Sequence, residues 1–179
     1  NQETHWLWHK EEANLESFDL VVLPGGFSYG DYLRCGSIAG KSKIINSVIE
    51  YAKSGGLLLG ICNGFQILTE TGLLPGVLQQ NKYLEFICKN VYVKINDTEN
   101  KFFKNIKKKI LELHIAHNEG NYFCSNDELK SIEDNSQIAV SYCDKEGAYN
   151  NESNPNGALK NIAGIFNKKK NILGMMPHP

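Results

Sequence analysis

The stretch Leu57–Gln66, which reads LLLGICNGFQ, decides the fold of this chain. Leu57–Ile61 is a continuous apolar run of strand length, bounded by glycines. Such runs are typical of strands covered on both faces, as in parallel sheets. A helix from Asn63 to Thr71 is expected to follow at once, with Gly72 as the residue that stops it. The stretch therefore predicts a buried strand, a sharp turn at Cys62 and a helix.

The residues before this stretch extend the same alternation. Asp19–Pro24 reads as a strand that ends in two glycines, and Lys41–Ser54 has apolar residues at helical spacing. A loop from Phe27 to Gly40 separates them, and His5–His9 is a short aromatic strand candidate. The order strand, loop, helix, strand, helix favours an α/β fold, and we expect a flavodoxin-like or Rossmann-like three-layer domain with a mostly parallel central sheet.

The second half of the chain predicts a small antiparallel strand region. Apolar and polar residues alternate around Val91–Ile95 and Leu111–Ile115, which is typical of half-buried strands. Gln137–Tyr142 is a further strand, and Ile162–Phe166 and Ile172–Met176 flank a polar hairpin turn. The chain shows neither an internal repeat nor a low-complexity linker, so residues 1–179 are expected to form a single domain.

Composition excludes several classes of function. Lys and Arg number 19, and Asp and Glu number 20. This charge balance gives no electrostatic indication of binding to nucleic acid or to an anionic membrane. We interpret Lys107–Lys109 and Lys168–Lys170 as solvated turns. The longest apolar run is too short for a bilayer, and the first residues given show no signal-peptide pattern. Five scattered cysteines without CxxC pairs indicate neither a disulfide framework nor a zinc site, so a cytoplasmic location is expected.

Cys62 is the residue with the clearest chemical meaning. A cysteine between a buried strand and a helix, with glycines two residues to either side, is the cysteine form of a nucleophile elbow. The turn raises the sulfur above the carboxyl edge of the sheet, where open α/β sheets bind ligands. The amino end of the helix favours a thiolate, and the Asn63 N–H can donate to an oxyanion. The other four cysteines, at positions 35, 88, 124 and 143, are expected to be buried and structural.

A cysteine nucleophile needs a base, and the chain offers five histidines. His178 follows an apolar strand directly, so the strand end would aim it at the same sheet edge as Cys62. The residues alone leave open whether His178 is that base or an ordinary surface or core histidine.

Five stretches together resemble class I, triad-type glutamine amidotransferases, and more closely the glutaminase subunits of phosphoribosylformylglycinamidine synthase. They lie in order over nearly the whole chain: Leu23–Arg34, Gly60–Glu70 with Gly72–Gly76, Ile115–Gly120, Asn154–Gly157 with Asn161–Gly164, and Gly174–His178. The resemblance implies that Cys62 is the nucleophile and His178 the general base and acid. It also implies that Gly25, Gly26 and Asn63 form the oxyanion hole.

The same resemblance implies a substrate and partners. Gln66 matches a residue that positions L-glutamine, and the loop Ala116–Gly120 matches a pocket-lining segment with His117 and Asn118. For His117 a structural or substrate-orienting role is expected. Ammonia would pass to a large synthetase subunit, with a small third subunit as a further expectation. The chain has no phosphate-binding GxxxxGK motif, so ATP and Mg²⁺ are expected on the synthetase, with no cofactor or metal in this chain.

The sequence departs from the family pattern at both ends. The family motif continues after Pro179 with a glutamate that orients the histidine, and the family has a strand and helix before the region of His5–His9. We expect these parts to lie outside the present sequence. Two alternatives stay open: another cysteine-elbow α/β hydrolase of peptidase-like or glyoxalase-like type, and a non-catalytic pseudo-glutaminase scaffold.

Overall fold

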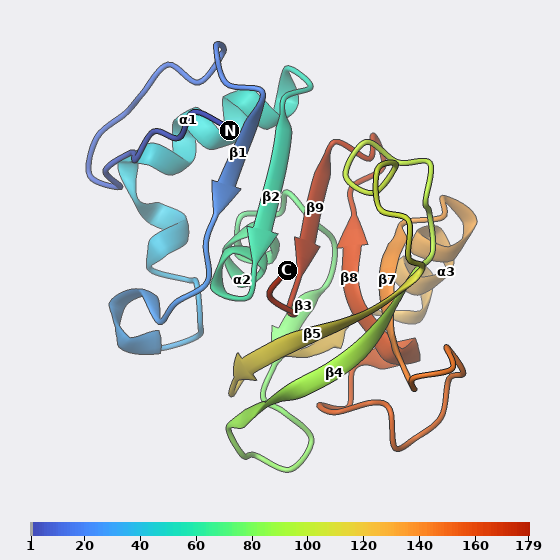
Figure 1. Cartoon of the computed structure of the whole chain (residues 1–179). Coiled ribbons are helices and arrows are strands. Elements are labelled where there is room, and N and C mark those ends of the chain that lie inside the picture. The colour runs from blue at the N-terminus through green and yellow to red at the C-terminus, as the bar shows by residue number, and fades with distance from the viewer. Residues whose placement is uncertain (1) are drawn as a thin grey trace.

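A seven-stranded mixed sheet forms the centre of the computed structural model, which describes residues 2–179 (Figure 1). The strand order is β1-β2-β9-β8-β7-β4-β5. The bounds are β1 Leu20–Leu23, β2 Leu57–Ile61, β4 Ile87–Ile95, β5 Ile110–His117, β7 Ile138–Cys143, β8 Ile162–Phe166 and β9 Ile172–Met175. The predicted α/β class is confirmed.

The sheet changes direction at β9. Strands β1, β2 and β9 run parallel, whereas β9, β8, β7, β4 and β5 pair antiparallel. Helix α1 (Lys43–Lys53) provides the crossover that the parallel pair β1–β2 requires. The polar turn between Phe166 and Ile172 joins β8 to β9 as the predicted hairpin. The expected parallel region and the antiparallel region of the second half are therefore parts of one sheet.

The sequence pattern missed three short elements. Helix α3 spans Asn126–Asp134, and β3 (Val77–Gln79) pairs with β6 (Asn121–Phe123) in a small separate sheet. The start of α3 carried a readable signal, because the Ser125 side chain accepts a hydrogen bond from the Glu128 N–H at 3.2 Å. The two strands are three residues long, too short for a period-2 pattern to be recognised.

The predicted aromatic strand at His5–His9 is wrong. Residues 2–17 contain no strand, and Trp6 is 93% exposed. The segment lies beside the start of α1, where the His9 carbonyl accepts a hydrogen bond from the Ile44 N–H at 3.3 Å. A strand needs a neighbouring strand to satisfy its backbone groups, and this segment has a helix terminus instead.

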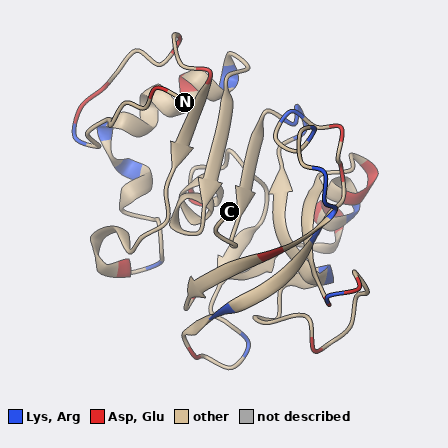
Figure 2. Ribbon diagram, in the orientation of Figure 1, with Lys and Arg blue, Asp and Glu red and all other residues tan. Residues whose placement is uncertain are grey.

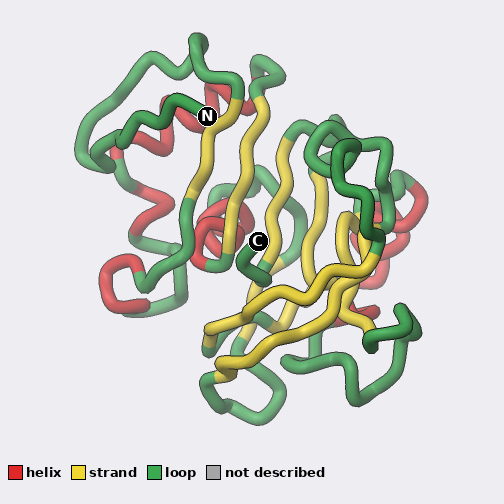
Figure 3. The backbone as a smooth tube through the Cα atoms, in the orientation of Figure 1, coloured by secondary structure: helices red, strands yellow, loops and turns green. Residues whose placement is uncertain are grey.

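The turn after β2 brings the functional residues to one edge of the sheet. Helix α2 (Asn63–Glu70) begins directly after Cys62, and the Cys62 N–H donates to the Met175 carbonyl at 2.8 Å. This bond joins the carboxyl ends of β2 and β9, and Figure 1 shows the C-terminus lying beside those same ends. The long connection between β1 and α1 contains two short 3-10 turns, η1 (Ser28–Asp31) and η2 (Ala39–Lys41), and its course is clear in Figure 3.

Charged residues are spread over the molecule without a single-sign face in the view of Figure 2. Lys and Arg lie interspersed with Asp and Glu along loops and helices, as the balance of 19 to 20 suggests. Among residues 2–179, every helix is too short or too polar to span a lipid bilayer.

Candidate active site

Cys62 occupies a strained turn at the end of β2. Its backbone has φ 50° and ψ −104°, in a region that residues with a side chain rarely adopt. The flanking glycines make the turn possible by leaving room for close backbone approach. A methyl group on Gly64 would collide with the Leu23 carbonyl oxygen, and one on Gly60 would lie 2.8 Å from the Gly64 carbonyl oxygen. The local geometry is that of a nucleophile elbow, as the sequence predicted.

The ends of the three parallel strands bring Cys62, Gly25 and His178 together. Gly25 follows β1, Cys62 follows β2 and His178 follows β9. The Gly25 backbone lies against both other residues, since an added Cβ would stand 3.4 Å from the Cys62 Cβ and 3.4 Å from the His178 Nε2. The candidate nucleophile and the candidate base therefore share one small space above the sheet edge.

His178 is held by its backbone, which leaves its ring available for chemistry. Its N–H donates to the His114 carbonyl at 2.8 Å, so strand β5 anchors it. Within the described part of the chain, its Nε2 is buried and makes no hydrogen bond to protein. Burial, together with the nearby His114, lowers the pKa of His178 below its ordinary 6.5. The imidazole is therefore neutral at neutral pH and able to accept a proton.

The thiol of Cys62 is neutral in the free site. Burial raises its pKa to about 11, and the Asn63 N–H opposes this rise. Asp31 raises the pKa further, and the Gly26 N–H lowers it. The expected effect of the helix amino end is present, but burial outweighs it. Proton removal by a base is therefore needed before the sulfur can attack.

Two of the three predicted oxyanion donors face the sulfur. The N–H groups of Gly26 and Asn63 lie close enough to the Cys62 thiol to lower its pKa. Gly25 instead lies against the imidazole of His178. Two backbone donors beside a nucleophile can bind the negative oxygen of a tetrahedral intermediate.

Gln66 lies one turn along α2 and is 4% exposed. Its Oε1 accepts from the Asn63 Nδ2 at 2.9 Å, and its Nε2 donates to the Glu119 carbonyl at 2.7 Å. These bonds connect the elbow helix to the segment after β5. The Ala116 carbonyl near the end of β5 lies 3.7 Å from the Cys62 sulfur, so α2 and β5 both border this thiol.

His117 is a buried neutral histidine with a defined tautomer. The Asn81 Nδ2 donates to the Glu85 and His117 carbonyls, so its Oδ1 is the acceptor that faces the His117 Nδ1 at 3.1 Å. Nδ1 therefore carries the proton. Burial lowers the pKa of His117 to about 4, and His178 adds to this effect. Asn118 is half-buried, and its carbonyl accepts from the Asn81 N–H at 2.9 Å.

The sequence reasoning missed Asn81 and Asn156, which hold the segment after β5. Asn81 is 1% exposed and also accepts from the Gly120 N–H at 3.1 Å. Asn156 is fully buried, and its Nδ2 donates to the Gly120 carbonyl at 2.8 Å. Asn156 lay in a stretch quoted for the resemblance, whereas Asn81 had no local signal, because its partners are distant in sequence.

The other cysteines differ from the sequence expectation in one case. Cys35, Cys124 and Cys143 are buried, as expected, but Cys88 is exposed on β4. The antiparallel pair β4–β5 turns this part of the strand toward solvent. Within residues 2–179, no three His, Cys, Asp or Glu side chains are grouped to hold a metal ion.

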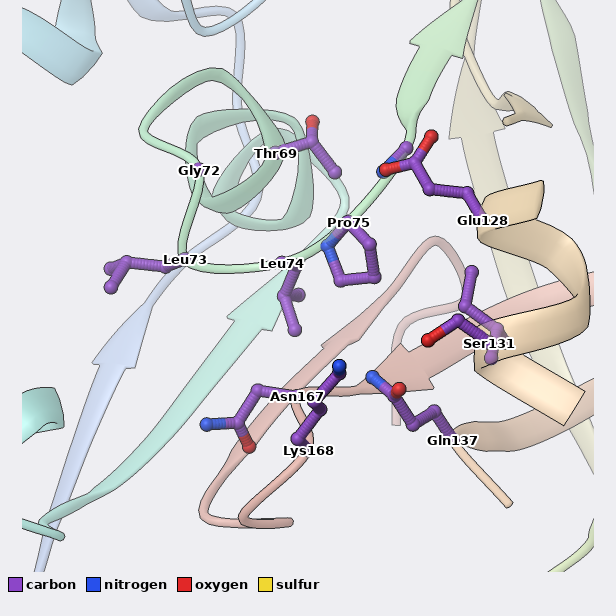
Figure 4. A pocket seen from close by; sticks show the side chains of 12 residues that line it. Thr69, Gly72, Leu73, Leu74, Pro75, Glu128, Ser131, Gln137, Asn167 and Lys168 are labelled. Carbon is purple, nitrogen blue, oxygen red and sulfur yellow. The ribbon is translucent and has the colours of Figure 1, made fainter. Parts of the chain in front are cut away.

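A separate cavity of about 530 Å³ lies away from these residues (Figure 4). It is lined from the end of α2, from α3 and from the β8–β9 turn, for example by Thr69, Glu128 and Lys168. None of the predicted site residues lines it. The chemistry of the chain is therefore assigned to the sheet edge at Cys62 and not to this cavity.

Comparison with known proteins gives the class first. Residues 5–179 match the model of the CobB/CobQ-like glutamine amidotransferase domain. The fold and the cysteine elbow described above are thus those of a glutamine amidotransferase.

Curated relatives narrow the assignment. The chain is 67% identical to the phosphoribosylformylglycinamidine synthase subunit PurQ of Pelagibacter ubique, over 97% of this chain and 76% of the relative. It is 52% identical to the Synechocystis PurQ, over 100% of this chain and 80% of the relative. The solved structure of PurLQS from Thermotoga maritima matches with a TM-score of 0.79 and 38% identity, covering 93% of this chain and 71% of that chain. The chain belongs to the PurQ family of glutamine amidotransferases.

Proposed function

We propose that this chain is the glutaminase subunit of a phosphoribosylformylglycinamidine synthase. It hydrolyses L-glutamine to glutamate and ammonia, and the ammonia passes to a synthetase subunit. There it is used for the ATP-dependent amidation of formylglycinamide ribonucleotide in purine biosynthesis. The observation that carries the proposal is the meeting of Cys62, His178 and the N–H groups of Gly26 and Asn63 at one sheet edge. The 67% identity to a PurQ subunit supports the substrate.

The first half-reaction forms a thioester. His178 takes the proton of the Cys62 thiol while the sulfur attacks the side-chain amide carbon of glutamine. The amide oxygen becomes an oxyanion and accepts hydrogen bonds from the Gly26 and Asn63 N–H groups. The intermediate then collapses, the carbon–nitrogen bond breaks, and the protonated His178 gives its proton to the departing ammonia. A glutamyl thioester remains on Cys62.

The second half-reaction releases glutamate. The now neutral His178 removes a proton from a water molecule, whose oxygen attacks the thioester carbonyl. The same two N–H groups bind the second oxyanion. The carbon–sulfur bond then breaks, and the proton returns from His178 to the sulfur. The site is restored without any metal or organic cofactor from this chain.

Three further residues are proposed to shape the glutamine pocket. Gln66 borders the elbow through the bond between its Oε1 and Asn63, and its amide is fixed at both ends. His117 and Asn118 belong to the segment whose Ala116 carbonyl lies beside the Cys62 sulfur. Because His117 is buried and neutral, we assign it an orienting role and not a proton-transfer role.

The synthetase is proposed to dock beside the site. Large apolar side chains are exposed on two neighbouring loops, and the rings of Phe27 and Phe86 lie 6.1 Å apart across them. Tyr32 and Leu33 continue this surface on one loop, and Tyr83 and Leu84 on the other. Exposed aromatic clusters are typical of interaction sites. The likeness to PurLQS supports partners of the PurL and PurS type. We further propose that ATP and Mg²⁺ bind to the synthetase and that the complex is cytoplasmic.

The test is ammonia release by the full-length protein in complex with its synthetase, comparing the wild type with Cys62→Ala. The exposed Cys88→Ala variant is the matched control. We expect the first variant to lose ammonia release while the complex still assembles, and the second to keep the wild-type rate. A well-assembled wild-type complex that releases no ammonia would establish the scaffold alternative. If simple esters or peptides acylate Cys62 to a thioester while a glutamine-like chloroketone fails to alkylate it, the result would favour another hydrolase.

A further inference from the structure

Glu119 makes contacts with two elements that border the reacting cysteine. Its main-chain carbonyl accepts from the Gln66 Nε2 at 2.7 Å, and its carboxylate Oε2 accepts from the Cys35 N–H at 3.1 Å. Gln66 lies on the elbow helix, whereas Cys35 lies in the long loop between β1 and α1. Glu119 itself follows β5. One residue therefore connects three segments that are far apart in the sequence.

Two other contacts join the loop to the elbow helix. Gly36 lies directly on the helix, since an added Cβ would stand 2.8 Å from the Ile67 nitrogen and 2.9 Å from the Gln66 carbonyl carbon. The Arg34 guanidinium makes two contacts with the Glu70 carboxylate, at 2.7 and 2.8 Å, between side chains that are 61% and 12% exposed. This ion pair joins the loop to the last residue of α2. The half-buried Cys35–Glu119 bond is the polar contact that joins the loop to the residue whose carbonyl holds Gln66.

The charges around Cys35 agree with this arrangement. Burial raises the pKa of the Cys35 thiol, and the Glu119 and Asp31 carboxylates raise it further. Cys35 therefore stays protonated and is no competitor of Cys62 as a nucleophile. Asp31 is the same residue whose charge acts on Cys62, and it lies in η1, where its backbone has φ 53°. A shift of the loop would consequently change the position of the Asp31 carboxylate relative to Cys62.

We propose that Glu119 is a positioning residue for glutamine binding: it fixes the loop and Gln66 relative to Cys62. This inference rests on the proposed glutaminase function and adds a role for a residue that does not itself touch the reacting atoms. The role needs a hydrogen-bond acceptor on the side chain and does not need its charge. The Gln66 side chain donates to the main-chain carbonyl of Glu119. This bond is therefore retained when the Glu119 side chain is substituted, as long as the segment stays in place.

The experiment measures kcat and KM for glutamine in the full-length protein bound to its synthetase. Glu119→Ala removes the acceptor, and we expect KM to rise about tenfold, as the loss of one hydrogen bond to a charged group suggests, with kcat within about threefold. Glu119→Gln keeps an acceptor oxygen for the Cys35 N–H, and its KM is expected to lie within about threefold of the wild type. Glu112→Ala on β5 is the control, because its side chain is exposed and accepts a hydrogen bond from Asn90, away from the loop and Gln66.

Thermal unfolding and alkylation of Cys62 by iodoacetamide accompany the kinetics. A merely structural role would lower the folded fraction, and with it kcat, without a change in KM. Either that pattern or wild-type constants in Glu119→Ala overturns the inference while the proposed function stands. A Glu119→Gln variant as impaired as Glu119→Ala overturns the acceptor role and indicates that the charge matters. A wild-type complex without ammonia release overturns the proposed function and this inference together.

Discussion

The imidazole of His178 packs directly onto Gly25, so that a methyl group on Gly25 would stand 2.6 Å from the His178 Cε1. This distance is too short for two carbon atoms, so any side chain at Gly25 must displace the ring. We predict that Gly25→Ala lowers the kcat for glutamine by about a hundredfold, because a misplacement of about 1 Å between reacting groups has effects of this size.

The control for this variant is Gly40→Ala. A Cβ on Gly40 would meet a side-chain carbon of Thr71 at 3.4 Å and the Glu70 Cβ at 3.8 Å, which are ordinary contacts. We expect wild-type kcat in Gly40→Ala and wild-type thermal stability in both variants. Full activity in Gly25→Ala would show that the ring does not need this position during turnover.

The pH dependence of glutamine hydrolysis should report the state of His178. Burial lowers the pKa of His178 below 6.5, and the base acts only in its neutral form. Activity therefore falls when His178 becomes protonated, and we predict that the acidic limb of kcat/KM lies below pH 6.5. The measurement is kcat/KM from pH 5 to 8 in the assembled complex. An acidic limb centred above 6.5 would mean that the site stabilises the charged imidazole.

Stability should depend on pH through His117. The pKa of its imidazole is about 4 in the folded state, against 6.5 in the unfolded chain. The folded state binds fewer protons, so the full stability is present above pH 6.5 and decreases as the pH falls toward 4. The full difference of about 3 kcal/mol is reached below pH 4, where His117 is protonated in the folded state as well.

Urea unfolding between pH 4 and 7 measures this change, with His117→Asn as the variant. The variant loses the bond to Asn81 and is expected to be less stable at pH 7, but with a much smaller slope below pH 6.5. His5→Asn is the control, because His5 is exposed and should keep the wild-type slope. An unchanged slope in His117→Asn would assign the pH dependence to other groups.

The central strands and the elbow could be predicted because their signals are local. The apolar run Leu57–Ile61 and the glycines around Cys62 place a strand and a turn without reference to the rest of the chain. The strand at Ile162–Phe166 was likewise predicted with its observed bounds. Elements of three residues, such as β3 and β6, offer too few positions for a periodic pattern.

The site could be predicted only in part, because some of its contacts depend on tertiary structure. Cys62 and His178 could be identified as candidate site residues because each follows a predicted strand within a motif. Asn81 could not, because its partners are distant in the sequence: His117 ends β5, and Gly120 follows that strand. The neutral thiol was also unexpected: the helix end predicts a thiolate, but the depth of burial that opposes it is a property of the packed domain.

The place of β9 in the sheet has a consequence for the order in which the protein is made. β9 comes after every other strand of the sheet in the sequence, yet it inserts in the middle, between β2 and β8. During synthesis the elbow leaves the ribosome long before His178, which follows β9. A nascent chain therefore holds Cys62 without its proposed base until β9 inserts between β2 and β8. Formation of the active site and insertion of β9 thus occur together.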